Sequence, residues 1–191
     1  MEAPTSATAR YDTIGQGYGR MRRADPAIMT VHHWDEGLWA GLGELARVAR
    51  ERVVILTLDA RVSSGLWLLR DYLPELAELE ARIFPALEDL AARLGGRTAV
   101  EVVPLSRDTP DGMLVSFWGT PAAVLDPARR AATSGFARLP PAVVDRAVCA
   151  LRDDLASGAW DARNGALRTQ AAWDVGLRLV VSELAGAPDE R

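Results

Sequence analysis

Several kinds of residue are missing or scarce in this chain, and each gap excludes a class of chemistry. Lysine is absent, so all 22 basic residues of the 191-residue chain are arginine. A lysine Schiff base and a phosphate-binding loop built on lysine are therefore excluded. The single cysteine, Cys149, excludes an intrachain disulfide and a cysteine-rich metal site. Its position on an amphipathic segment predicts a small buried residue.

Long apolar runs and an excess of positive charge are also missing. No run approaches the roughly 20 apolar residues of a membrane-spanning helix, and residues 1–10 lack the apolar centre of a signal peptide. The net charge is −4, whereas binding to nucleic acid needs a positive field. We therefore expect a soluble, cytoplasmic protein whose partners include neither a membrane nor a nucleic acid.

Three segments predict β-strands. Residues 53–58 (VVILTL) form a continuous apolar, β-branched run, which is typical of a strand that helices cover on both faces. Residues 98–104 (TAVEVVP) and 175–184 (VGLRLVVSEL) predict two more strands, and the short segment 29–34 (MTVHHW) has a weaker preference. Doubly wound sheets usually carry about five strands or more, so three or four are few for this length.

Helical spacing of apolar residues fills most of the chain between these strands. It predicts helices at residues 35–49, 66–73, 74–84 and 86–94. From about 111 to 170 the pattern is helical throughout, and 140–158 is the clearest amphipathic helix. We expect one α/β domain over residues 1–191 with a helical insertion at about 111–170.

Four parts of the chain carry a family resemblance. They are RYDTIGQGYGRMRRADPAI (10–28), TVHHWDEGLWAGLGELARVARERVVILTLD (30–59), WLLRDYLPEL (67–76) and the closing LRLVVSEL (177–184). Together they resemble one branch of the class I S-adenosylmethionine-dependent methyltransferases, the type 11-like group. The first part resembles the segment that closes over the cofactor, and the second resembles the end of the fourth strand, a helix and the fifth strand. The others, with the helical insertion, resemble the substrate-side remainder.

The comparison with this family also exposes a gap. In the family, a glycine-rich turn after the first strand and an acidic residue ending the second strand bind the cofactor. Here Ile28 runs directly into 29–34, which leaves no room for those strands. Gly15, Gly17 and Gly19 have no strand before them, so they indicate a lid loop. The resemblance thus implies a reduced Rossmann-like three-layer sandwich of three to four strands. It implies no cofactor-binding residue, and no cofactor unless a partner chain completes the S-adenosylmethionine site.

Three polar residues are candidates for chemistry. His32 and His33 are the only histidines, and either could act as a general base because imidazole titrates near neutral pH. On a strand their side chains point to opposite faces, so at most one faces a cleft, and a structural role is the alternative. Asp59 ends a strand where open α/β sheets bind ligands, although capping of a helix or turn is the alternative. Two adjacent imidazoles without a third ligand make a poor metal site, so no metal is expected.

Several aromatic and basic residues are candidates for a substrate pocket. Tyr11, Tyr18 and Arg23 could cover a small molecule, or they are lid residues with nothing to cover. Trp34 and Trp67 could line an apolar cavity, or they belong to the core. The pocket would then take a small apolar molecule.

Three functions are compatible with these patterns. The first is a degenerate methyltransferase-family protein without independent catalysis. The second is a repurposed, cofactor-free enzyme of small-molecule biosynthesis, such as a cyclase or an isomerase, that uses the old acceptor cavity. The third retains methyl transfer, with a second chain supplying the cofactor half.

The strand at 53–58 predicts a partner. In the complete fold of the family a further strand lies beside it, and here little more than residues 29–33 could take that place. The run VVILTL contains neither the charge nor the proline with which proteins protect an open edge. We expect a homodimer joined along this edge, or a partner chain that completes the sheet, unless residues 11–28 fold back over the gap.

Overall fold

The computed structural model describes Trp34 and residues 36–184, which divide into two compact units. The sheet unit contains the described residues up to Leu66, Ala77–Leu105 and residues 174–184. The helical unit contains Trp67–Leu76 and Ser106–Trp173. None of the described helices is long and apolar enough to cross a membrane. The expectation of a single domain over 1–191 stays a prediction.

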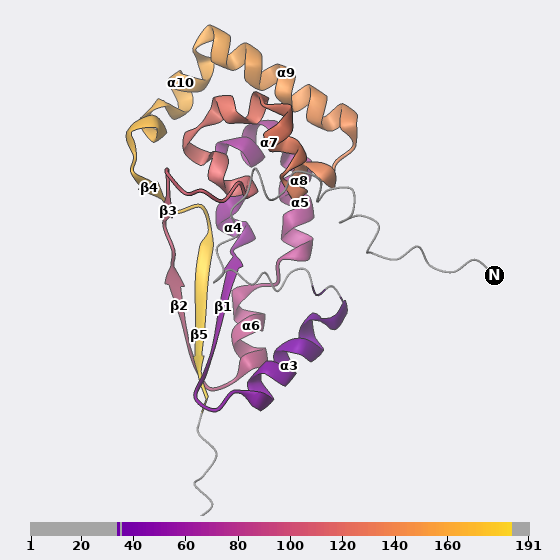
Figure 1. Cartoon of the computed structure of the whole chain (residues 1–191), viewed down its shortest axis with the longest axis vertical. Coiled ribbons are helices and arrows are strands. Elements are labelled where there is room, and N and C mark those ends of the chain that lie inside the picture. Colours follow the sequence, from indigo (N-terminus) through magenta and orange to yellow (C-terminus); the bar gives the residue numbers. More distant parts are fainter. Residues whose placement is uncertain (1–33, 35, 185–191) are drawn as a thin grey trace, which may run out of the picture. The chain divides into compact units, whose positions relative to one another are not determined.

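A three-stranded sheet is the frame of the sheet unit (Figure 1). Its strands, in the order β1-β5-β2, are β1 (Arg52–Leu58), β5 (Leu177–Glu183) and β2 (Arg97–Val102). The central strand β5 is antiparallel to both neighbours, and Val180 lies opposite Ile55 on one side and Val100 on the other. The three strands predicted from apolar runs are thus confirmed. The weaker candidate at 29–33 lies outside the described residues.

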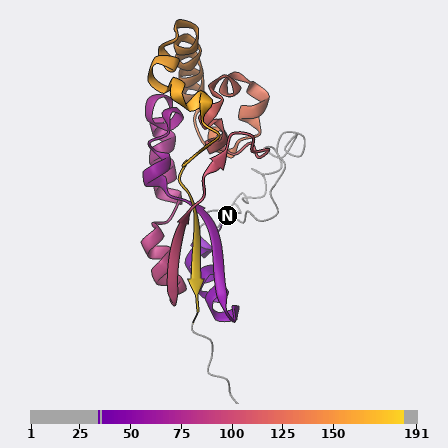
Figure 2. The same cartoon turned by 90° about the vertical axis from the view of Figure 1, so that its left-hand side faces the viewer.

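Two helices, α3 (Leu38–Val48) and α6 (Leu87–Leu94), lie on one side of this sheet (Figures 1 and 2). Apolar residues recur at helical spacing on both, and this stripe packs against the strands. The shared core consists of Leu38, Leu42, Val53, Ile55, Leu87, Leu90, Leu94 and Val180. Burial of these side chains holds the helices to the sheet.

The opposite face of β1 differs from the expectation. The apolar run predicts helices on both faces, but the side chain of Val54 is 51% exposed. The residues beside it on that face are Leu56 of β1 and Leu179 and Val181 of β5, and all three are half-buried. The prediction that both faces are covered is therefore wrong at Val54. A continuous apolar run indicates a strand but does not reveal which face a helix covers.

A tight turn connects β1 to the next helix and contacts Gly176. Asp59 caps the short helix α4 (Ala60–Ser63), and the Asp59 backbone N–H donates to the carbonyl of Gly176 at 2.7 Å. Gly176 has a φ of +97°, and a Cβ there would lie 2.9 Å from the Asp59 carbonyl oxygen and 3.1 Å from the Ser63 nitrogen. Both the backbone angle and the close approach require glycine. After a segment that belongs to the helical unit, the chain forms α5 (Pro74–Ile83).

Short helices make up most of the helical unit. In chain order they are η2 (Leu68–Tyr72), η3 (Leu114–Gly119), η4 (Pro121–Leu125), α7 (Pro127–Ala131), α8 (Ser134–Ala137), α9 (Pro141–Ser157), α10 (Ala159–Asn164) and η5 (Gly165–Thr169). Helices thus run through most of residues 111–170, as the apolar spacing predicts. The strands β3 (Leu105–Ser106) and β4 (Ala172–Trp173) pair as a two-stranded sheet at the ends of this stretch.

Cys149 corrects one expectation about α9. The buried residues of this helix are Ala147, Val148 and Leu151, which recur at helical spacing. Cys149 lies outside that stripe and is exposed. The prediction that it is a buried residue is therefore wrong, because it follows a buried position by one residue and so faces another direction.

The side chain of Arg107 joins the ends of two of the short helices. Its guanidinium donates to the carbonyl of Gly119 at 2.8 Å and to that of Gln170 at 2.9 Å. It also donates to the carbonyl of Leu167 and lies 5.0 Å from the centre of the Trp118 ring. Carbonyls at helix ends have no partner within the helix, so one arginine satisfies several of them.

The close backbone contact at Gly176 gives the first prediction. Gly176→Ala should destabilise the protein through both its positive φ and the clash with Asp59 and Ser63. Gly95→Ala is the matched control, because Gly95 has a φ of +69° and a Cβ there would meet nothing within 4 Å. The control should cost about 1 kcal/mol, and Gly176→Ala at least about 1 kcal/mol more. Urea unfolding measures the free energy of unfolding of both variants. Equal losses of stability in the two would show that the contact of residue 176 with Asp59 and Ser63 has no effect.

Candidate functional site

The carboxyl end of β1 is the best-defined polar site of the sheet unit. Asp59 accepts a hydrogen bond from the backbone nitrogen of Arg61 at 3.1 Å and from its Nε at 3.0 Å. The second carboxylate oxygen of Asp59 accepts from Arg61 Nη2 at 3.2 Å. Arg61 also donates to Glu88 Oε1 at 2.9 Å. The hydrogen bond to Asp59 and, to a smaller extent, the one to Glu88 raise the pKa of Arg61 above its ordinary value. Asp59 therefore acts as a helix cap and an ion-pair partner.

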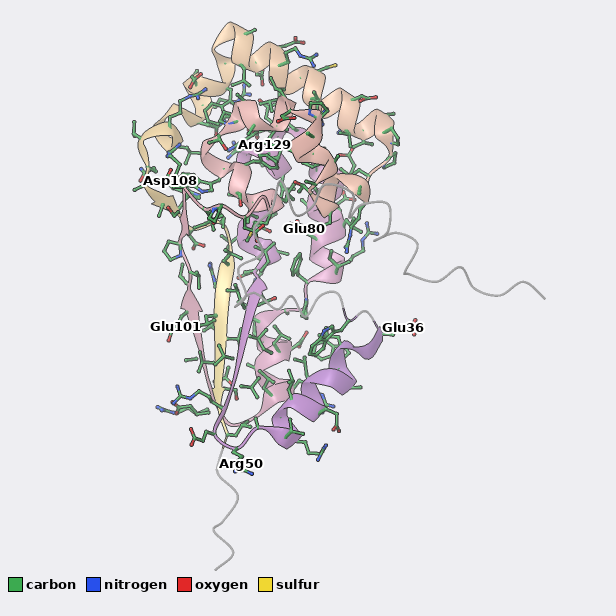
Figure 3. All side chains as sticks on the ribbon, viewed as in Figure 1. Glu36, Arg50, Glu80, Glu101, Asp108 and Arg129 are labelled. Carbon is green, nitrogen blue, oxygen red and sulfur yellow. The ribbon has the colours of Figure 1, made fainter. Side chains whose placement is uncertain are left out.

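A second, buried carboxyl group lies next to the turn that follows β1. Ser63 is fully buried, and its Oγ donates to Oε2 of the buried Glu80 at 3.2 Å (Figure 3). The backbone nitrogen of Ser63 donates to the carbonyl of Asp59, so the two acidic residues flank one turn of helix. Sequence reasoning missed Glu80, because it is one of several glutamates on a polar helix. A carboxyl group in this place can accept hydrogen bonds from hydroxyl or amine groups.

One further polar atom at the end of β1 is notable. Thr57 is 3% exposed, and its hydroxyl oxygen has no hydrogen-bond partner among the described residues. A buried hydroxyl without a partner is costly in a folded protein. Within the described ranges, no three His, Cys, Asp or Glu side chains come together in a way that could hold a metal ion.

The helical unit contains a polar network around Tyr72. Its hydroxyl donates to Asp154 Oδ2 at 2.6 Å and accepts from Arg163 Nη2 at 3.0 Å. Arg163 also pairs directly with Asp154. Burial, and then the bond to Asp154, raise the pKa of Tyr72 to about 12. Tyr72 thus stays protonated at neutral pH, and the network ties η2 to α9 and α10.

The aromatic core of the helical unit surrounds Trp67. This side chain is 2% exposed, and its Nε1 donates to the carbonyl of Trp118 at 2.8 Å. Its ring meets those of Tyr72 and Trp160 edge to face, at centroid distances of 5.8 and 5.4 Å. Of the two open roles for Trp67, core packing is the one that these contacts show.

Trp34 has a comparable place in the sheet unit. It packs against the core that α3 and α6 share with the sheet. A Cβ added at Gly41 of α3 would lie 2.7 Å from the Trp34 ring, so the helix has a glycine where the ring approaches it. Trp34 and Trp67 therefore belong to two different cores. The remaining candidates, Tyr11, Tyr18, Arg23, His32 and His33, lie outside the described residues and stay predictions.

Three buried donors in the helical unit lack acceptors in the described structure. They are Nε1 of Trp118, Nε1 of Trp160 and Nδ2 of Asn164. Trp160 and Asn164 are four residues apart on α10, so they share a face of that helix. The sequence gives no sign of these donors, because a tryptophan Nε1 finds or loses its partner only through tertiary packing.

Comparison with known proteins adds one likeness. No protein-family model and no curated protein matches the chain. A solved structure from Anabaena variabilis ATCC 29413, a provisionally assigned methyltransferase from an antibiotic biosynthesis pathway, is 28% identical with a TM-score of 0.72. The present chain has a methyltransferase-like fold. The match covers 81% of this chain and 63% of the neighbour, so the chain spans less than two thirds of that protein's length.

The network at Tyr72 gives the second prediction. Hydrogen bonds from Tyr72 and Arg163 lower the pKa of Asp154 below its ordinary value. A lowered pKa stabilises the folded state above about pH 4, and this stabilisation is lost as the pH falls further. Asp154→Asn should therefore lower the urea midpoint at pH 7, and its difference from the wild type should narrow below about pH 4.

The matched control for this prediction is Asp153→Asn. Asp153 is an exposed neighbour on the same helix, and its carboxylate makes no hydrogen bond or ion pair with another described residue. This variant should keep the wild-type midpoint at both pH values. Equal effects of the two substitutions would show that the Tyr72 network does not contribute to stability.

Proposed function

We propose that this chain is the substrate-side part of a methyltransferase-family protein that does not transfer methyl groups on its own. The observation that carries the proposal is a three-stranded sheet in a chain that spans 63% of a methyltransferase-like neighbour. The described sheet has no strand beyond β1. In the family, the cofactor-binding strands lie on that side.

The loop after β1 supports the absence of a nucleotide site in the described part of the chain. A dinucleotide or nucleoside cofactor needs a glycine-rich turn after a strand and an acidic side chain that is free to accept from ribose hydroxyls. The residues after β1 are Asp59, Ala60 and Arg61, without glycine. Both carboxylate oxygens of Asp59 already accept hydrogen bonds from Arg61. Neither requirement is met there.

The proposal has two forms that differ in the partner. In the first, the protein is degenerate and binds at most a small apolar molecule, with no cofactor. In the second, a partner chain supplies the strands that hold S-adenosylmethionine, and methyl transfer takes place only in the complex. Both forms predict that the isolated chain lacks the cofactor site.

The rival function, a repurposed cofactor-free enzyme, has less support. It needs an apolar cavity lined by tryptophans near His32 or His33. Trp67, Trp118 and Trp160 are each almost fully buried, and Trp67 contacts the other two directly. This packing favours a core role over the lining of a pocket. Both histidines lie outside the described residues, so the rival stays a prediction from the sequence.

Titration calorimetry with S-adenosylmethionine tests the proposed function. The purified full chain should show no binding in the low micromolar range, because the described residues after β1 provide neither a glycine-rich turn nor a free ribose-binding acid. The same sample should unfold cooperatively on heating, which controls for loss of structure. A dissociation constant of ~1 μM, which corresponds to about −8 kcal/mol, would contradict the proposal, since binding of that strength requires a formed site.

A further inference from the structure

We propose that Thr57 and Arg178 form a binding site for the carboxylate of a small molecule, at the end of the sheet where β1 stops. The inference goes beyond the proposed function and does not rest on it. Its evidence is a buried guanidinium with one unused edge, a buried hydroxyl without a partner, and the strand register that places the two side by side.

The register of the sheet places these residues in one row across its three strands. Thr57 of β1 lies opposite Arg178 of β5, and Arg178 lies opposite Val102 of β2. Residues directly opposite each other in an antiparallel pair project from the same face, with Cβ atoms about 4.5–5.5 Å apart. The row therefore brings a hydroxyl, a guanidinium and an aliphatic side chain together on one face of the sheet. This is the face on which Ile55 and Val180 meet α3 and α6 further along the strands.

The guanidinium of Arg178 is only partly used by its neighbours. Its Nη1 donates to Asp174 Oδ1 at 2.7 Å and to the carbonyl of Leu177 at 2.8 Å, and its Nη2 donates to Asp174 Oδ2 at 3.1 Å. These bonds occupy three of the five N–H donors of an arginine. The other two, on Nε and Nη2, have no acceptor among the described residues. Together they form the edge that binds a carboxylate through two parallel hydrogen bonds.

The ion pair of Arg178 with Asp174 leaves the positive charge as the more buried member. The side chain of Arg178 is 9% exposed, whereas that of Asp174 is 40% exposed. The Asp174 carboxylate is therefore partly hydrated, and its charge is screened more strongly than that of the guanidinium. A hydrogen bond to a buried charged donor is stronger than the same bond in water. The unused edge thus favours an anionic oxygen over a neutral one.

The hydroxyl of Thr57 supplies the second polar group of the site. This hydroxyl is buried and has no hydrogen-bond partner in the described part of the chain, which costs stability. Nε is the guanidinium nitrogen that follows the strand most closely along the Arg178 side chain, so the unused edge is the part of the guanidinium nearest to the row. A carboxylate that accepts from both Thr57 and Arg178 satisfies the two residues at once.

Val102 indicates which kind of molecule carries the carboxylate. It is 52% exposed, whereas Thr57 is 3% and Arg178 is 7% exposed. The row is thus open at β2 and closed at β1, so we expect a ligand to approach from the Val102 side. An aliphatic side chain at the open end favours an apolar body on the ligand. It also favours a carboxylic acid over a phosphate, which is more strongly hydrated.

An NMR titration of the full chain with benzoate tests the site, because benzoate carries a carboxylate on an apolar ring. Benzoate should shift the Nε–H signal of Arg178. Benzamide, which has the same shape without the charge, should leave this signal unchanged at equal concentration. Inorganic phosphate, the other oxyanion that fits the unused edge, should need an about tenfold higher concentration for the same shift.

Thr57→Val isolates the contribution of the hydroxyl. It should weaken the binding of benzoate about tenfold, and it should keep or raise the urea midpoint without benzoate, because no hydrogen bond is lost. Thr98→Val is the matched control on the same face of the sheet. The Thr98 hydroxyl is hydrogen-bonded to the Gly95 carbonyl at 3.4 Å and to Ser182 Oγ at 3.2 Å. This variant should bind benzoate like the wild type and have a lower urea midpoint.

Several results would overturn the proposal. They are an Nε–H signal of Arg178 that benzoate does not move, equal shifts with benzamide, and wild-type affinity for benzoate in Thr57→Val. Phosphate that binds as tightly as benzoate would overturn the assignment to an apolar carboxylic acid. None of these probes contains a nucleoside, so calorimetry with S-adenosylmethionine is a separate measurement, and each proposal can fail alone.

Discussion

The pairing of β5 between β1 and β2 is the constraint on which the rest of the sheet unit depends. β5 lies near the C-terminal end of the described chain, and the helical unit precedes it. Val180 of β5 is fully buried and belongs to the core beneath α3 and α6. The ends of the β1–β5 ladder are closed by backbone bonds from Asp59 to Gly176 and from Leu184 to Glu51. Without β5, β1 and β2 have no partner in the described sheet.

Much of the secondary structure could be predicted from the sequence, whereas the pairing could not. Apolar, β-branched runs mark β1, β2 and β5, because strand preference and burial are local properties of a segment. The order β1-β5-β2 depends on contacts between residues far apart in the chain, such as Ile55 with Val180. The exposure of Val54 escaped prediction for a related reason: the run VVILTL carries aliphatic side chains on both faces, and only tertiary packing decides which face α3 and α6 cover.

The candidate site could be predicted only in part. The position of Asp59 after a strand marks it as a candidate, and the structure shows it as a helix cap that is hydrogen-bonded to Arg61. The buried Glu80 was missed, because its environment is set by Ser63 on a distant turn. From the sequence, Trp67 could line an apolar cavity or belong to the core, and only the contacts with Trp118 and Trp160 show that it fills a core. Residues that are alike in the sequence thus differ in role through contacts that the sequence does not contain.

The position of β5 between β1 and β2 defines the described sheet, and the same order is expected in solution. Nuclear Overhauser contacts between side-chain methyl groups test this most directly, because Ile55, Val180 and Val100 lie on one face in neighbouring strands. The account predicts contacts from Val180 to both Ile55 and Val100. Contacts that join Ile55 directly to Val100, with Val180 apart from both, would contradict it.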